Sequence, residues 1–222
     1  MNFNHAFVKP LDLPRVEING KRYYQTESGD RFPSVTTMLS AVLPKDGLDA
    51  WRDAVGNEEA DRATNRGARR GTALHLMCEK YVLNDPTYNR GIMPSIIELF
   101  NQVKPVLDKR LGVVYGSEIP LYSRYLRLAG TCDLVAMFDG KISIIDFKTT
   151  NWAKDMSMLE GYFIQEAIYS VMFEEIYKKP ITQLVTISAG DSEPNAQVVI
   201  QHRDTWAPKA VELIKQFYEK SA

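Results

Sequence analysis

Two acids and a lysine, Asp133, Asp146 and Lys148, fall where a β-hairpin would bring them together. The predicted strands 131–138 and 141–147 are joined by an Asp-Gly pair, which is a signal for a two-residue turn. Counted from that turn, the two aspartates occupy equivalent positions, so their carboxylates can face each other across the strands. Side chains alternate along a strand, so Lys148 shares the face of Asp146.

This grouping predicts a divalent-cation site. Carboxylates that converge at the end of an apolar hairpin repel each other, and the arrangement is costly unless a positive charge offsets the repulsion. Hard oxygen ligands of this kind suit Mg²⁺ or Mn²⁺. The alternative interpretation is that these charges are hairpin ends in water, which is the commoner meaning of an isolated Asp-x-Lys.

The N-terminal region is expected to pack on the core as a hairpin over 15–32 and a short helix from Thr36 to Val42. Serine and threonine at a helix start usually serve as caps. The alternative is that the hydroxyls and free backbone N–H groups at this helix start hold a phosphate. The residues in question are Ser34, Thr36 and Thr37.

The region 47–84 is predicted to be helical in two or three pieces, the last of them over 68–83. His75 and Glu79 stand on one face of that last piece, at i and i+4. A helical histidine is usually packed or solvated, and the arginines near the helix start could pair with nearby acids. Those arginines are Arg66, Arg69 and Arg70, and the acids are Glu58, Glu59 and Asp61.

A third candidate acid, Glu118, lies on the predicted strand 113–122. The next strand is expected to begin within 124–130, which makes three consecutive antiparallel strands with the hairpin. Before them, a helix over 95–110 should kink or break at Pro105.

After a polar loop at 151–157, a long helix over 159–178 carries Gln165 and Tyr169 at i and i+4. The remaining predicted elements are strands 181–188 and 197–201 and a helix over 205–220.

Composition limits the classes of function. With 45% hydrophobic and 25% charged residues the chain of 222 residues reads as one domain, 1–222, in which 1–46 form the N-terminal hairpin and short helix. The net charge of −1 argues against a protein that coats nucleic acid through bulk charge, but permits a local basic patch. No apolar run reaches the length of a membrane span and no secretory signal is evident, so a cytoplasmic protein is expected.

Two cysteines cannot supply a four-cysteine iron–sulfur cluster or structural zinc site. A phosphate-binding GxxxxGK[ST] motif is absent from the sequence, so no nucleotide cofactor is expected.

Five elements in order resemble the RecB-type branch of the PD-(D/E)xK nucleases: His75, Asp133, Asp146-Phe147-Lys148, Gln165 and Tyr169. The flanking segments 130–133 and 149–150 are similar to those of the family, and 33–37 resembles phage-encoded members and the related mitochondrial genome-maintenance exonuclease. Cys132 stands where the superfamily's name has a proline.

The resemblance implies an α/β (α+β) fold with a central mixed β-sheet of the restriction-endonuclease-like type, flanked by helices. It implies a metal-dependent DNA exonuclease of phage origin that acts on single-stranded or linear DNA ends in replication or recombination, with phage proteins of those processes as partners. The implied metal ligands are His75, Asp133, Asp146 and the backbone carbonyl of Phe147, and Glu118 could orient a metal water or bind a second ion. Lys148 would stabilise the attacking hydroxide or the developing charge.

Further residues are candidates for contact with the DNA strand. Gln165 and Tyr169 would position the active-site loop and the strand, although core packing and capping would also explain them. Trp152 and Tyr162 could stack on bases. Candidate phosphate contacts are Arg66, Arg69, Arg70, Arg124, Arg127 and Lys154, in addition to the hydroxyl side chains of Ser34, Thr36 and Thr37. A catalytically silent DNA-binding or assembly module on the same fold, and a structure-specific endonuclease, are the alternatives.

Overall fold

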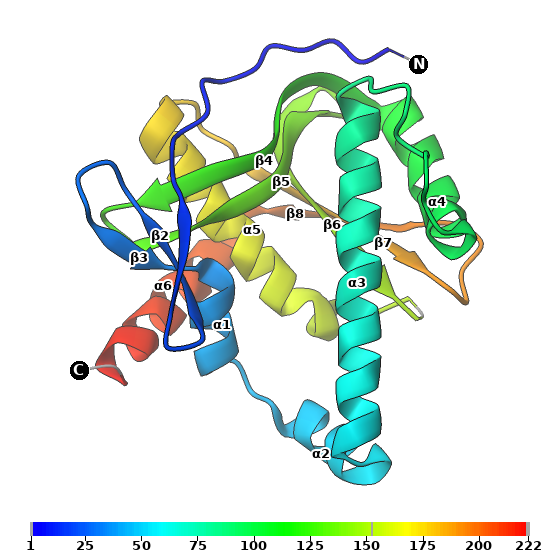
Figure 1. The fold of residues 1–222 in the computed structure, drawn as a ribbon. Coiled ribbons are helices and arrows are strands. Elements are labelled where there is room, and N and C mark those ends of the chain that lie inside the picture. Colours follow the sequence, from blue (N-terminus) through cyan, green and yellow to red (C-terminus); the bar gives the residue numbers. More distant parts are fainter. Residues whose placement is uncertain (1, 152, 221–222) are drawn as a thin grey trace.

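The computed structural model describes residues 2–151 and 153–220, and Figure 1 shows its central β-sheet with helices on both faces. The sheet has five strands in the order β4-β5-β6-β7-β8, in which β6 and β7 are parallel and the other neighbours are antiparallel. This arrangement confirms the expected mixed sheet flanked by helices. The strands are β4 (Leu111–Ser123), β5 (Leu128–Phe138), β6 (Lys141–Thr150), β7 (Gln183–Gly190) and β8 (Gln197–His202).

Apolar side chains divide the helices between the two faces of the sheet. On one face, the buried residues of α1 (Val35–Val42), α5 (Met156–Tyr177) and α6 (Arg203–Glu219) form one core cluster with the sheet. On the other face, α3 (Asn57–Val82) and α4 (Pro94–Arg110) form a second cluster. Helix α5 makes the crossover between the parallel strands β6 and β7, which a short turn could not connect.

The hairpin of β5 and β6 has the register that its turn residues predict. Asp139 and Gly140 have φ angles of 49° and 79°, as a tight two-residue turn requires. From there the ladder runs back to the pair of Leu134 and Ile145. Continued by one residue, the same register places Asp133 opposite Asp146.

A smaller sheet of three strands lies against β5. It consists of β1 (Arg15–Ile18), β2 (Lys21–Gln25) and β3 (Arg31–Pro33), in that order. The Tyr24 hydroxyl is 3.1 Å from Oγ1 of Thr131, and Ser34 forms a β-bridge with Ala129. These contacts fix the small sheet as a wall beside the main one.

The segment 4–8 runs alongside the edge strand β4. The backbone N–H of Ala6 donates to the carbonyl of Val114, and the N–H of Val114 donates to the carbonyl of Asn4. The N–H of Val8 donates in turn to the carbonyl of Tyr115. The segment therefore acts as a short additional strand on part of the β4 edge.

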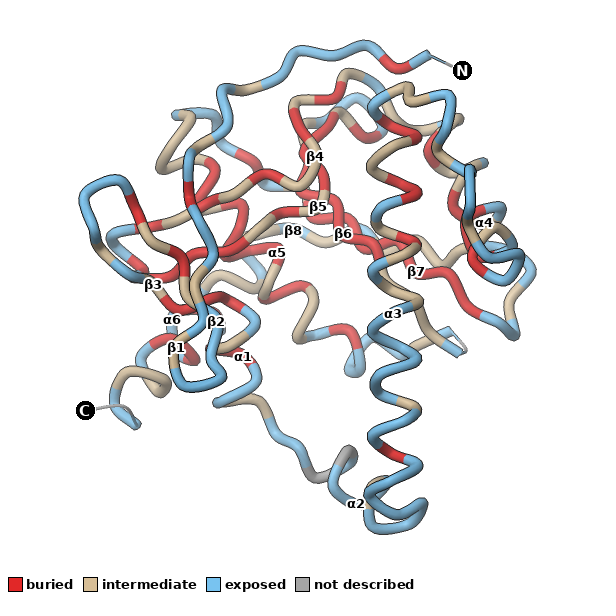
Figure 2. The backbone as a smooth tube through the Cα atoms, viewed as in Figure 1, coloured by how far each residue is buried: buried red, intermediate tan, exposed pale blue. Residues whose placement is uncertain are grey.

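Helix α3 is continuous over 26 residues, so the predicted helix start at 68 is wrong. Glycine inside a helix costs about 1 kcal/mol relative to alanine, and α3 contains Gly67 and Gly71. The C-terminal half of α3 packs on the sheet, and this packing outweighs the cost. Figure 2 shows that the N-terminal half and α2 (Asp46–Val55) project from the body with mostly exposed residues.

Other boundaries also differ from the prediction. Helix α4 runs through Pro105 without a break, because its apolar side chains, among them Phe100 and Val103, are buried against the sheet. Residues 124–127 form a turn, so β5 begins only at Leu128. Helix α5 begins at Met156, three residues earlier than expected.

The two cysteines, Cys78 and Cys132, are buried free thiols. Among the helices of the described residues, none combines the length and the apolar character needed to span a membrane.

Candidate active site

Three acids lie at one level on three adjacent strands. Asp133 of β5 stands opposite Asp146 of β6, as the hairpin register requires. On β4, Ser117 pairs with Leu134 and Ile119 with Cys132, which leaves Glu118 opposite Asp133. The result is a row of carboxyl groups across the sheet.

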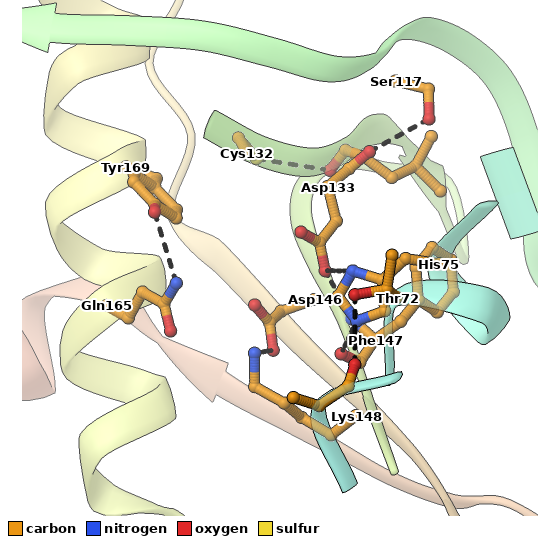
Figure 3. A network of polar contacts seen from close by, with 12 residues as sticks. Thr72, His75, Ser117, Cys132, Asp133, Asp146, Phe147, Lys148, Gln165 and Tyr169 are labelled. Carbon is orange, nitrogen blue, oxygen red and sulfur yellow. Dashed lines mark hydrogen bonds and ion pairs between the residues drawn. The ribbon is translucent and has the colours of Figure 1, made fainter. Parts of the chain in front are cut away.

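Asp133, His75 and the Phe147 carbonyl converge at one point (Figure 3). Oδ2 of Asp133 accepts the backbone N–H of Phe147 at 2.9 Å and lies 3.4 Å from Nδ1 of His75. Nε2 of His75 donates to the Phe147 carbonyl at 2.6 Å. Ligand atoms of His75, Glu118 and Asp133 all lie within 4.8 Å of one another. These groups can therefore reach a common centre.

Buried Asp146 and half-buried Lys148 form an ion pair on one face of β6. Asp146 is only 3% exposed. Burial raises the pKa of Asp146 to about 6, although the charge of Lys148 opposes this shift. Burial lowers the pKa of Lys148, but the negative charges of Asp146 and Asp133 more than compensate, so the pKa lies above its ordinary value. Lys148 is consequently an ammonium held against a carboxylate.

Glu118 occupies a strained position on β4. Its φ angle is 50°, in the left-handed region that non-glycine residues seldom adopt. Burial and then the charges of Asp133 and Glu79 raise the pKa of Glu118 to about 7. Mutual repulsion of this kind, together with a donor set of carboxylate oxygens, a carbonyl oxygen and an imidazole, fits a divalent cation.

A cavity of about 710 Å³ opens over this cluster. Figure 3 shows α3 with Thr72 and His75 on one side, α5 with Gln165 and Tyr169 on the other, and the acids and Lys148 between them. Of the predicted site residues, those that line the cavity are Ser34, Thr36, His75, Glu118, Asp133, Lys148, Tyr162, Gln165 and Tyr169.

Gln165 and Tyr169 interact with each other, since Nε2 of Gln165 donates to the Tyr169 hydroxyl at 3.2 Å. Tyr169 is almost fully buried, and burial raises the pKa of its hydroxyl. Its ring lies directly against the backbone of Gly130.

The hydroxyls at the start of α1 serve first as caps. Oγ of Ser34 accepts the backbone N–H of Thr37 at 3.0 Å, and it also contacts the hydroxyl of Thr36 at 2.9 Å. Nζ of Lys154 donates to the hydroxyl of Tyr162 at 2.8 Å, which places Lys154 just behind the cavity wall.

The arginines predicted to contact phosphates do not line the cavity over the acids. Arg66, Arg69 and Arg70 line a separate groove of about 660 Å³ between α3 and the start of α4. Arg124 pairs with Asp30 at 2.8 Å, and Arg127 lies over the ring of Tyr218. Trp152 falls outside the residues that the structure describes.

Sequence reasoning missed the two arginines that do line the cavity, Arg15 and Arg22. Arg15 pairs with Tyr24 across β1 and β2, and Arg22 is two residues from Tyr24, so all three side chains share one face of the small sheet. Among the described residues, neither guanidinium has a hydrogen-bond or ion-pair partner. Alternation in the hairpin could have shown their common face, but not what it faces.

Glu166 was also missed. It belongs to the buried face of α5, and the hydroxyl of Thr186 donates to its Oε1. Burial and then the charge of Asp146 raise the pKa of Glu166 well above its usual range, whereas Thr186 and Lys148 lower it. The sequence signal for this residue was its position: an acid on the apolar side of a predicted helix, directly after Gln165.

Comparison with known proteins identifies a nuclease family. The family model of the PD-(D/E)XK nuclease superfamily matches residues 21–220 of this chain. A component of an ATP-dependent helicase/nuclease from Streptococcus pyogenes serotype M12 (strain MGAS2096) is 22% identical over 151 residues, and the same holds for its counterpart from serotype M28 (strain MGAS6180). Each match covers 56% of this chain but only 12% of the relative. A crystal structure of a candidate exonuclease from Eubacterium rectale is similar with a TM-score of 0.48 and 11% identity, over 68% of this chain and 65% of that chain.

Proposed function

Because this chain belongs to the PD-(D/E)XK nuclease superfamily, we propose that it is a metal-dependent DNA exonuclease that hydrolyses phosphodiester bonds. The observation that carries the proposal is the convergence of His75, Glu118 and Asp133 beside the Asp146–Lys148 pair in one cavity. These groups combine a cation site with an ammonium held in place by an ion pair, which are the two elements that this hydrolysis needs.

The cation, Mg²⁺ or Mn²⁺, would be held by His75, Asp133, Asp146 and the Phe147 carbonyl, with Glu118 as a further ligand or as the partner of a second ion. When bound, such an ion lowers the pKa of water and offsets the charge of the phosphate. Asp133 is oriented for this role by the backbone N–H of Phe147.

Lys148 supplies the fixed positive charge of the reaction. Its ammonium lies 4.8 Å from the centre of the Tyr162 ring and is paired with Asp146. A charge held in place before the reaction stabilises the developing negative charge on the phosphate at little reorganisation cost. The Gln165–Tyr169 pair forms the adjoining wall and would hold the DNA strand against the acids.

The strand would enter between the small sheet and α3. Arg15 and Arg22 on the small sheet face the acids across the cavity and would bind the phosphates next to the scissile one. Ser34 and Thr36, at the N-terminus of α1, lie on the same wall. In the separate groove Arg66 is paired with Glu59 and Arg70 with Asp191, so Arg69 is the arginine that would contact the strand beyond the site.

The biological setting is part of the proposal. The curated relatives are components of an ATP-dependent helicase/nuclease, and the match to this chain covers 12% of their length. We infer that the chain degrades linear or single-stranded DNA ends in replication or recombination, in the cytoplasm of a cell that a phage infects, together with phage proteins of those processes. It would use no nucleotide and no iron–sulfur cluster.

The test compares end-labelled linear DNA, both single- and double-stranded, with a covalently closed circle, each incubated with Mg²⁺ or with EDTA. We expect Mg²⁺-dependent loss of the linear substrates alone. Cleavage of the circle would instead identify a structure-specific endonuclease. Binding of DNA without cleavage of any substrate would identify a silent DNA-binding module.

A further inference from the structure

Glu166 is a buried acid that the mechanism above does not use. None of its surface is exposed to solvent. Its Oε1 accepts the Thr186 hydroxyl, whereas its Oε2 is buried and has no hydrogen-bond partner among the described residues. A buried oxygen without a partner is costly and is uncommon in folded proteins. Its retention beside a reactive centre therefore suggests a role there.

Two observations, through Thr186 and through Tyr162, place Glu166 in the neighbourhood of Asp146 and Lys148. Thr186, which holds Glu166, is the direct neighbour of Asp146 across the parallel strands β6 and β7. Tyr162 lies four residues before Glu166, hence on the same face of α5, and its ring covers the Lys148 ammonium. That ammonium, paired with Asp146 in Figure 3, is thus bordered by the face of α5 that carries Glu166.

We propose that Glu166 is a positioning residue that holds the Lys148 ammonium when a divalent cation binds Asp146. This inference rests on the proposed function, because it assumes that Asp146 is a metal ligand. Lys148 and the cation would otherwise compete for the same carboxylate. A buried ammonium that loses its counter-charge is strongly destabilised. Burial and the charge of Asp146 hold Glu166 towards its neutral form in the metal-free protein. A cation on Asp146 offsets that charge, so Glu166 can ionise and its Oε2 can give the ammonium a second carboxylate, which keeps Lys148 in the site.

The variant Glu166→Gln tests this role. Glutamine keeps the shape of the side chain and can still accept the Thr186 hydroxyl, but it offers the ammonium no charge. We expect Mn²⁺ affinity, measured by calorimetry on the full chain without DNA, to fall about tenfold, as is typical when a group behind a metal ligand is lost. Thermal unfolding in EDTA should change little. Glu160→Gln, the same change at an exposed position of α5, is the matched control and should bind Mn²⁺ like the wild type.

Lys148→Met provides the decisive comparison. If Glu166 acts through the lysine, Glu166→Gln should have no further effect on Mn²⁺ affinity once Lys148 is methionine. Thr186→Val removes the hydroxyl that anchors Glu166, and it should weaken Mn²⁺ binding as Glu166→Gln does. This variant replaces Glu166→Gln in the test if Glu166→Gln does not fold.

Three results would overturn the inference, and they are distinguishable. Unchanged Mn²⁺ affinity in Glu166→Gln refutes the role of Glu166 but leaves the proposed function intact. An equal loss with and without Lys148 shows that Glu166 acts on the metal site and not through the lysine. A wild-type protein that binds no Mn²⁺ refutes the proposed function as well.

Discussion

Tyr169 packs so closely on Gly130 that a β-carbon at position 130 would lie 2.7 Å from Cε1 of the tyrosine ring. This contact joins β5, three residues before Asp133, to the helix that carries Gln165. The distance between the acid row and the Gln165–Tyr169 wall is therefore set by the absence of one side chain.

Gly130→Ala should displace the tyrosine ring and break its hydrogen bond with Gln165. Overpacking of this kind costs about 1–3 kcal/mol of the free energy of unfolding, and we expect cleavage to fall because the wall moves. Urea unfolding and a nuclease assay check both effects. Gly67→Ala is the control: nothing lies within 4 Å of a β-carbon there, and alanine should stabilise α3 by about 0.5–1 kcal/mol. Equal behaviour of the two variants would contradict the contact.

Lys148→Met should strongly slow cleavage while the protein stays folded. Loss of a preorganised charge at the reacting phosphate typically lowers the rate constant about 100- to 1,000-fold. Single-turnover cleavage of end-labelled DNA at saturating Mg²⁺ measures the effect. Lys141→Met, at the exposed start of the same strand, should retain wild-type rates. Activity of Lys148→Met within a few-fold of the wild type would exclude the assigned role.

Glu118 should make the metal-free protein less stable as the pH rises. Its pKa rises from 4.5 in the unfolded chain to about 7 in the folded protein, so between these values the folded state binds more protons than the unfolded state. The stabilisation is complete below pH 4.5 and is lost as the pH rises through 7.

In EDTA we therefore expect Glu118→Gln to gain thermal stability relative to the wild type between about pH 5 and about pH 8. Saturating Mg²⁺ should reverse the difference at the upper end of this range, because the cation favours the ionised wild-type carboxyl. A constant difference across the range would show that Glu118 keeps an ordinary pKa.

Arg15→Ala and Arg22→Ala should each weaken DNA binding and reduce its dependence on salt, because each removes one phosphate contact. The slope of log affinity against log salt should fall by about 1 for each arginine. Fluorescence anisotropy of labelled DNA with Ca²⁺ in place of Mg²⁺ measures both quantities. Arg31→Ala, on the same small sheet but paired with Gln25, should bind as the wild type does. An unchanged slope would remove the two arginines from the substrate path.

The sequence predicted the acid pair because a two-residue turn defines the register of its hairpin completely. Once Asp139-Gly140 is the turn, Asp133 and Asp146 must be opposite each other, whatever the rest of the chain does. The position of Glu118 does not follow from the turn in this way, since register shifts between Leu111 and Gly116 interrupt β4 before it. Its nearness to Asp133 is visible only in three dimensions.

Other features depend on long-range packing and could not be predicted. Arg15 and Arg22 reach the cavity because Tyr24 attaches the small sheet to Thr131, which is 107 residues away in the chain. Glu166 meets Asp146 only through Thr186 on a strand that follows the crossover. Helix α3 passes through its glycines because of its packing on the sheet, which local propensity does not include.

The segment 4–8 has a consequence for the solution behaviour of the protein. Without it, backbone donors and acceptors of β4 at Val114 and Tyr115 would be open at the edge of the main sheet. An open sheet edge is a template on which a strand of another molecule can pair. Removal of residues 1–9 should therefore favour association of chains through β4, which light scattering would detect. Residues 4–8 would thus limit self-association through β4.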